Sequence, residues 1–148
     1  MFRKPLLIWK MAMDIINKLN QLMPEIIARF PTIQVFYLFG SHADGGAEDR
    51  SDVDVAVFTD GGEGSAMELE LGVFLQRHLN REVDVVILQK ASPILQHEVL
   101  KARKRLYEKD PEVRAILEVK SFRDYLDSRY YLEKRFGKGD LDGQYADH

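Results

Sequence analysis

The feature that most constrains this sequence is a short apolar run, residues 52–58 (DVDVAVF), that contains two aspartates. Its valines and its length predict a β-strand in the core of a sheet. Successive side chains of a strand point to opposite faces, so Asp52 and Asp54 project from the same face. Two like charges held this close repel each other unless a cation lies between them. The run therefore predicts a charged site on a core strand, unless the two aspartates only cap the start of the strand as turn residues.

Further segments with strand composition lie on either side of this run. Residues 33–39 (IQVFYLF) and 82–88 (EVDVVIL) are rich in β-branched and aromatic residues, and residues 105–107 (RLY) are expected to form a short edge strand. Helical spacing of apolar residues predicts helices over residues 11–30, about 67–79, 93–102 and 111–136. Pro24 is expected to break the first helix, because proline is tolerated in the first turn of a helix and not in its interior. Ser92 and Asp110 each precede a proline, which is the pattern of an N-cap followed by the first helical residue.

These segments predict one α/β (α+β) domain, in which a small mixed sheet of about three or four strands is flanked by helices. We expect this domain to span residues 11–137 of the 148-residue chain. Residues 1–10 would be an N-terminal extension, since Met11 and Met13 leave a later natural start open. The polar, glycine-rich residues 138–148 would form a disordered tail.

Composition narrows the class of function. The net charge is −3, so the overall field does not favour binding to a nucleic acid, and nucleic acid is not expected as the main substrate. The absence of cysteine excludes disulfides and thiolate zinc sites and fits a reducing cytoplasm. No segment is apolar enough for a membrane span, so we expect a cytoplasmic protein. The basic run at 101–105 (KARKR) is either a solvated helix end or a contact for phosphates.

A third carboxylate and a glycine–serine pair complete the candidate site. Asp84 lies in the apolar segment 82–88, with Val86 and Leu88 on its face. If this strand lies beside 52–58, then Asp52, Asp54 and Asp84 converge and form a cage of oxygen ligands for one or two magnesium ions. Alternatively, Asp84 only pairs with a nearby arginine such as Arg81.

Gly40 and Ser41 directly follow the strand at 33–39. A glycine there lets backbone N–H groups approach an anion closely, and the serine hydroxyl is a further donor, so a phosphate chain can bind. The four histidines show no spacing typical of metal ligands, and we assign them no metal role.

Gly40 and Ser41, followed by ten residues and then by Asp52-Val53-Asp54, match the G-S-x10-D-x-D signature of the DNA polymerase β-like nucleotidyltransferase superfamily, which the chain thus resembles. Its small size and long last helix are similar to the minimal nucleotidyltransferases, the MNT antitoxins of HEPN/MNT toxin–antitoxin systems. The resemblance implies that Asp52, Asp54 and Asp84 are catalytic and bind Mg²⁺, and that Gly40 and Ser41 bind ATP. It also implies transfer of AMP from ATP to a tyrosine hydroxyl of a HEPN ribonuclease toxin, which is thereby neutralised.

One residue departs from the family pattern. Relatives often carry an arginine shortly after the glycine–serine pair, where this chain has Asp44. The departure puts nucleotide affinity and preference in question, and Arg50 or another basic residue would have to replace the missing cation.

Two alternatives to this function stay open. The nucleotide could be transferred to a small hydroxylated molecule such as an aminoglycoside, or the chain could be a non-catalytic antitoxin that acts by binding alone. Aromatic residues crowd the last helix, at Tyr125, Tyr130, Tyr131 and Phe136. They either pack the helix on the sheet or form a surface for the toxin.

Overall fold

The computed structural model of the chain describes residues 3–40, 52–62, 64 and 66–137. The first half of this range forms helix α1 (Arg3–Arg29), strands β1 (Ile33–Phe39) and β2 (Val53–Thr59), and helix α3 (Met67–Leu79). The second half forms strand β3 (Val83–Ile87), a 3₁₀ turn η1 (Leu88–Lys90), helix α4 (Pro93–Lys101), strand β4 (Lys104–Glu108) and helix α5 (Pro111–Phe136).

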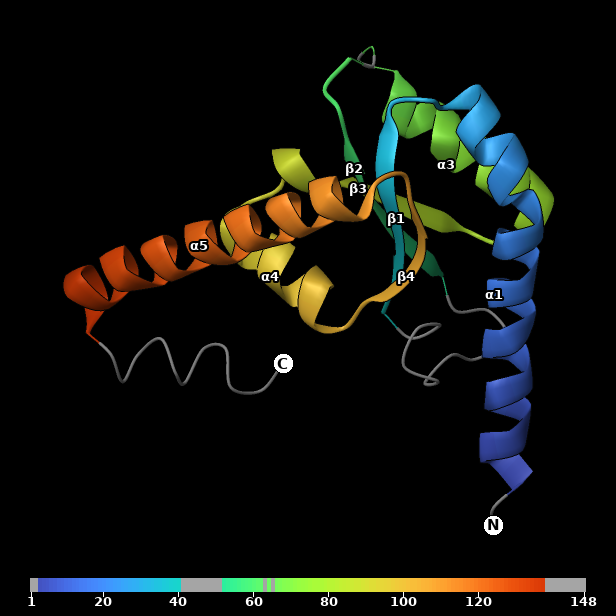
Figure 1. The fold of residues 1–148 in the computed structure, drawn as a ribbon. Helices are drawn as coiled ribbons and strands as arrows, with labels where there is room; N and C mark the ends of the chain where they lie inside the picture. The colour runs from blue at the N-terminus through green and yellow to red at the C-terminus, as the bar shows by residue number, and fades with distance from the viewer. Residues whose placement is uncertain (1–2, 41–51, 63, 65, 138–148) are drawn as a thin grey trace.

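The four strands form one mixed sheet in the order β3-β2-β1-β4 (Figure 1). β1 pairs antiparallel with both β2 and β4, whereas β2 and β3 run parallel and are joined through α3. The prediction of a small mixed sheet flanked by helices is confirmed, and so is the short edge strand, which extends over Lys104–Glu108.

Helices cover both faces of the sheet because the strand side chains alternate between two apolar clusters. On one face, Val53, Val55 and Val57 of β2 pack with buried residues of α1 and α3. On the other face, Ala56 and Phe58 of β2 pack against α4 and α5. Side chains along β2 therefore alternate between two apolar faces of the sheet, and an even-numbered residue of β2 lies on the α4/α5 face.

Helix α1 corrects one expectation from the sequence. The predicted break at Pro24 is wrong, because α1 runs without interruption from Arg3 to Arg29. Pro24 is exposed, whereas its neighbours Met23 and Ile26 are buried in the core. The packing of the apolar side of α1 on the sheet therefore outweighs the backbone hydrogen bond that the proline removes.

The caps of α4 and α5 agree with the sequence. The Ser92 hydroxyl accepts a hydrogen bond from the Leu95 N–H at 3.2 Å, and the Asp110 carboxylate accepts one from the Glu112 N–H at 2.9 Å. In both helices a proline follows the cap, so its missing N–H is one that the helix would leave unpaired in any case.

A polar network fixes the first half of α5 to the sheet. The buried Tyr37 of β1 donates a hydrogen bond from its hydroxyl to Oε1 of Glu118 at 2.7 Å. Arg114 bridges Glu118 and Glu108, with donor–acceptor distances of 3.2 and 2.6 Å. Burial and the hydrogen bond to Glu118 raise the pKa of Tyr37 well above its ordinary value of 10.0. The second half of α5 extends away from the sheet beyond α4 (Figure 1).

Candidate active site

The pairing of β2 with β3 brings two of the predicted site residues together. Asp54 lies directly opposite Asp84 in the parallel register of these strands. Residues paired in this way point to the same face of a sheet, with their backbones about 5 Å apart. Because Ala56 and Phe58 of the same strand face α4 and α5, both carboxylates lie on that face, at the end of the sheet where β2 and β3 begin. The predicted neighbourhood of these two strands is thus confirmed.

Gly40 lies directly against the Asp54 carboxylate. Phe39, the last residue of β1, pairs with Asp54, so Gly40 follows directly beside it. Gly40 has a φ of +74°, and a methyl group built on its Cα would overlap Oδ2 of Asp54 and lie 3.3 Å from its Cγ. Only glycine combines this backbone conformation with room for the carboxylate. The sequence predicted that Gly40 allows close contact with an anion. Its second role, leaving room for the Asp54 side chain, depends on the pairing register of β1 and β2, which no sequence pattern indicates.

Asp52 lies at the same end of the sheet. Asp52 immediately precedes β2 and is exposed, as Asp84 is, whereas Asp54 is half-buried. The strand pairing reaches this end, since the Val53 N–H donates to the Glu82 carbonyl at 2.9 Å. Ser41, together with Asp44 and Arg50, lies outside the described residues, so the predicted role of Ser41 in nucleotide binding stays a prediction.

The predicted magnesium site has the right ligand chemistry, but the structure does not gather its side chains into a metal-binding group. Asp52, Asp54 and Asp84 supply only carboxylate oxygens, which are the ligands that magnesium prefers. Because Gly40 has no side chain, its backbone lies close against the Asp54 carboxylate. Within the described parts of the chain, no group of three or more His, Cys, Asp or Glu side chains could hold a metal ion. A magnesium site formed by the three aspartates therefore stays a prediction.

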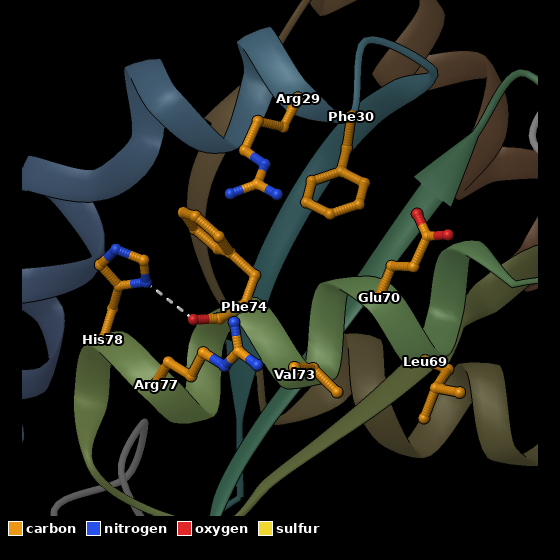
Figure 2. Close-up of a pocket in the computed structure, with 8 residues that line it drawn as sticks. All are labelled: Arg29, Phe30, Leu69, Glu70, Val73, Phe74, Arg77 and His78. Carbon is orange, nitrogen blue, oxygen red and sulfur yellow. Dashed lines mark hydrogen bonds between the residues drawn. The ribbon is translucent and has the colours of Figure 1, made fainter.

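A separate pocket of about 500 Å³ lies between α1 and α3, on the opposite face of the sheet (Figure 2). The Arg29 guanidinium lies 4.8 Å from the centre of the Phe74 ring, and Nδ1 of His78 is hydrogen-bonded to the Phe74 carbonyl oxygen at 2.8 Å (Figure 2). Its lining contains none of the predicted site residues. It is not part of the aspartate site.

The basic run at 101–105 spans the end of α4 and the start of β4. Two of its arginines form ion pairs. Arg103 lies 3.5 Å from the Glu118 carboxylate, and Arg105 lies 3.5 Å from that of Glu108. The first pair joins the segment before β4 to α5, and the second lies within β4. Both favour a structural role for the two arginines over a site for phosphates. Glu118 was not singled out in the sequence, because nothing marks it among the other charged residues of the last helix.

The structure thus places two carboxylates on neighbouring strands, beside a glycine that follows a third strand. Comparison with known families agrees: the family described as "Polymerase beta, Nucleotidyltransferase" matches residues 17–112. The chain therefore belongs to this nucleotidyltransferase family, and the resemblance seen in its motif is confirmed.

Among curated proteins, the chain is similar to the protein adenylyltransferase MntA of Shewanella oneidensis. The two are 33% identical over 102 residues, which cover 68% of this chain and 71% of that protein.

Solved structures of toxin–antitoxin complexes contain chains with the same fold. One, a toxin–antitoxin crystal structure with AMP-PNP, matches with a TM-score of 0.69 and 28% identity, over 80% of this chain and 93% of that one. Another shows a tri-AMPylated HEPN toxin of Shewanella oneidensis in complex with an MNT antitoxin; its TM-score is 0.65 at 26% identity, over 83% and 93% of the two chains.

None of the helices in the described part of the chain has the length and continuous apolar character that crossing a membrane requires.

Proposed function

We propose that this protein is an antitoxin that transfers AMP from ATP to a tyrosine hydroxyl of a cognate HEPN ribonuclease toxin and so neutralises it. The observation that supports the proposal best is the arrangement of Gly40, Asp54 and Asp84 side by side across three neighbouring strands. Gly40 lies against the Asp54 carboxylate, and Asp84 is paired with Asp54 in the sheet. The names of its relatives, a protein adenylyltransferase and an antitoxin bound to an AMPylated toxin, support the same reaction. We place the reaction in the cytoplasm, where ATP is available.

The reaction is an in-line displacement at the α-phosphorus of ATP. The tyrosine oxygen forms a bond to this phosphorus, the bond between the phosphorus and the bridging oxygen to the β-phosphate breaks, and pyrophosphate leaves. The phenolic proton has to be removed as the new bond forms. Asp84 is the proposed acceptor of this proton or a group that orients the hydroxyl, because it is exposed at the open edge of this arrangement.

Gly40 and Ser41 are proposed to bind the triphosphate of ATP. Gly40 follows β1 with a positive φ, a backbone conformation found in turns whose N–H groups bind anions. The AMP-PNP complex of a structural relative supports ATP as the donor.

Magnesium is proposed as the cofactor, with Asp52, Asp54 and Asp84 as its ligands. When bound, it neutralises the charge on the phosphates and polarises the reacting phosphorus. The tasks left to the protein are positioning and the exclusion of competing acceptors. Without a cation, the paired carboxylates would repel both each other and the triphosphate.

The test is transfer of label to the purified product of the adjacent gene, the expected toxin. Two parallel reactions contain ATP labelled at either the α- or the γ-phosphate, with magnesium present or chelated. The proposal predicts label in the toxin only from α-labelled ATP and only with magnesium. Label from γ-labelled ATP would indicate a kinase, and transfer only to an added aminoglycoside would indicate the small-molecule alternative. Inhibition of the toxin without any label would indicate an antitoxin that acts by contact.

A further inference from the structure

The pocket between α1 and α3 is lined by one arginine from each helix (Figure 2). Arg29 lies in the last turn of α1, and Arg77 lies in the last turn of α3. Both side chains are exposed, and neither forms an ion pair with any residue that the structure describes. Guanidinium groups are preferred partners of phosphate and carboxylate groups. Two such groups in one pocket, neither neutralised by a described residue, favour an anionic ligand.

One end of the pocket is organised around Phe74, a buried residue of α3. The Arg29 guanidinium lies over the Phe74 ring, 4.8 Å from its centre. Arg77 follows three residues after Phe74, and residues three apart are neighbours on the surface of a helix. His78 donates from Nδ1 to the Phe74 carbonyl oxygen at 2.8 Å, so its Nε2 is left to a ligand. This end of the pocket therefore presents two cations and one imidazole nitrogen.

The opposite end of the pocket carries a carboxylate. Glu70 precedes Arg77 on α3 by about two helical turns, or about 10 Å along the helix axis. Figure 2 shows Glu70 on the far side of the pocket from His78. The Glu70 carboxylate forms no ion pair with a described residue, so it does not neutralise either arginine. The exposed side chains of Leu69 and Val73 add an apolar surface to the lining.

These groups set the chemistry of a matching ligand. It carries an anion for the arginines, a hydrogen-bond donor for Glu70, and an apolar part for Leu69 and Val73. A ribonucleoside monophosphate has all three. Its phosphate is anionic, its ribose hydroxyls are donors of the kind that acidic side chains accept in nucleotide sites, and its base has apolar faces. The pocket volume of about 500 Å³ lies within the range of small-molecule sites.

Two other occupants would match only part of this lining. Inorganic phosphate would bind the arginines and leave Glu70 and the apolar surface without a partner. An acidic peptide would bring further carboxylates and carbonyl oxygens close to the Glu70 carboxylate, which repels them. The combination of two arginines, a separate carboxylate and an apolar surface therefore favours a nucleotide over either of these.

We propose that this pocket binds a ribonucleoside monophosphate such as AMP, with the phosphate on Arg29 and Arg77 and the ribose hydroxyls on Glu70. The site goes beyond the proposed function, because it lies on the face of the sheet opposite to the aspartate site and takes no part in the transfer. Helix α3 joins β2 to β3, the two strands that carry Asp54 and Asp84. A nucleotide that bridges α1 and α3 would hold the helix behind these strands and stabilise the folded chain.

The test is calorimetric titration of AMP into the purified chain with EDTA, which removes the magnesium that the aspartate site is proposed to need. The wild type is expected to show saturable binding. Arg77→Gln and Glu70→Ala are expected to weaken this binding by at least about tenfold, because each removes a charge-assisted hydrogen bond. The matched controls Arg123→Gln and Glu68→Ala change exposed residues outside the pocket and are expected to stay within about twofold of the wild type. Circular dichroism checks that each variant is folded.

Inorganic phosphate and adenosine are the ligand controls, since each carries only part of the recognised groups. Both are expected to bind at least about tenfold more weakly than AMP. Phosphate or adenosine that binds as tightly as AMP would overturn the assignment of a nucleotide. Absence of AMP binding to the wild type would overturn the proposal, and so would AMP binding that Arg77→Gln and Glu70→Ala leave unchanged.

The proposed function fails separately. The double variant Asp52→Asn/Asp54→Asn is expected to bind AMP in EDTA as the wild type does. A loss of binding in this variant would place the nucleotide at the aspartates and overturn the inference. If AMP binds in the pocket but no AMP is transferred to the toxin, the pocket stands and the reaction does not. If AMP is transferred but does not bind in the pocket, the reverse holds.

Discussion

Gly40, directly after strand β1, lies so close to the carboxylate of Asp54 that a methyl group on the glycine would overlap a carboxylate oxygen. This position requires a residue that can adopt a positive φ and that has no side chain next to the Asp54 carboxylate. The strand that carries Asp54 and the turn that is proposed to bind phosphate therefore form one unit, and a change in either is expected to disturb both.

Gly40→Ala is expected to lower AMP transfer by at least about 100-fold, because it displaces the Asp54 carboxylate. The positive φ adds a loss of stability of about 1 kcal/mol. Gly61→Ala is the matched control, since Gly61 has a φ of +82° but has no atom within 4 Å of the added Cβ. It should lose similar stability and keep its activity. Comparing kcat/KM and Tm of both variants tests this, and equal loss of activity in the two would contradict it.

Asp84→Asn is expected to lower kcat for AMP transfer by at least about 100-fold with little effect on stability, since the shape is retained and Asp84 is exposed. The control is Asp60→Asn, the same substitution on an exposed aspartate just past the other end of β2. Rates at saturating ATP separate a loss of chemistry from a loss of binding. Near-normal transfer by Asp84→Asn would remove Asp84 from both of its proposed roles.

The stability of the chain should depend on His97 in mildly acidic solution. Burial lowers the pKa of His97 below its ordinary value of 6.5; Glu98 opposes this shift, while Lys101 and Arg129 add to it. Below about pH 6.5 the unfolded chain takes up a proton that the folded chain resists, so the free energy of unfolding falls as the pH drops toward the folded pKa.

His97→Phe keeps an aromatic ring against Tyr125 and removes this titration. Urea denaturation between about pH 7.5 and 5, a range that brackets the ordinary pKa of histidine, should therefore show a smaller acid-induced loss of stability in the variant than in the wild type. Parallel curves for the two proteins would contradict the assignment.

Tyr37→Phe is expected to destabilise the fold by about 2 kcal/mol, because it removes a buried hydrogen bond to a charged acceptor. Tyr107→Phe is the control, since Tyr107 is half-buried on β4 and its hydroxyl has no partner among the described residues. Denaturation midpoints at neutral pH compare the two. A loss of stability no larger in Tyr37→Phe than in Tyr107→Phe would mean that the bond to Glu118 contributes little.

The strands and the helix caps could be predicted from the sequence because they depend on the pattern of neighbouring residues. The apolar run before Gly40 and the Ser92 and Asp110 caps could each be read from a few neighbouring residues, and each has its counterpart in the structure. The continuous helix through Pro24 could not be read in this way, since the packing that keeps it helical comes from the sheet.

The site was only partly predictable for the same reason. The composition of the second and third strands indicated that Asp54 and Asp84 belong to one site, but their direct opposition is a matter of strand register. The fit of Gly40 to Asp54 and the bond between Tyr37 and Glu118 join residues far apart in the sequence, and neither leaves a local pattern. Of the aromatic residues of the last helix, Tyr130, Tyr131 and Phe136 are exposed, as a partner surface would require, whereas Tyr125 is half-buried and stacks on His97.

The most direct test of the account is the intact mass of both proteins after the chain is incubated with ATP, magnesium and the adjacent-gene toxin. The account predicts that the toxin gains whole AMP units, that the antitoxin chain stays unchanged, and that the double variant Asp52→Asn/Asp54→Asn gives no gain. An unmodified toxin, with the wild-type chain folded and bound to it, would contradict the central claim that the aspartates on these strands carry out nucleotidyl transfer.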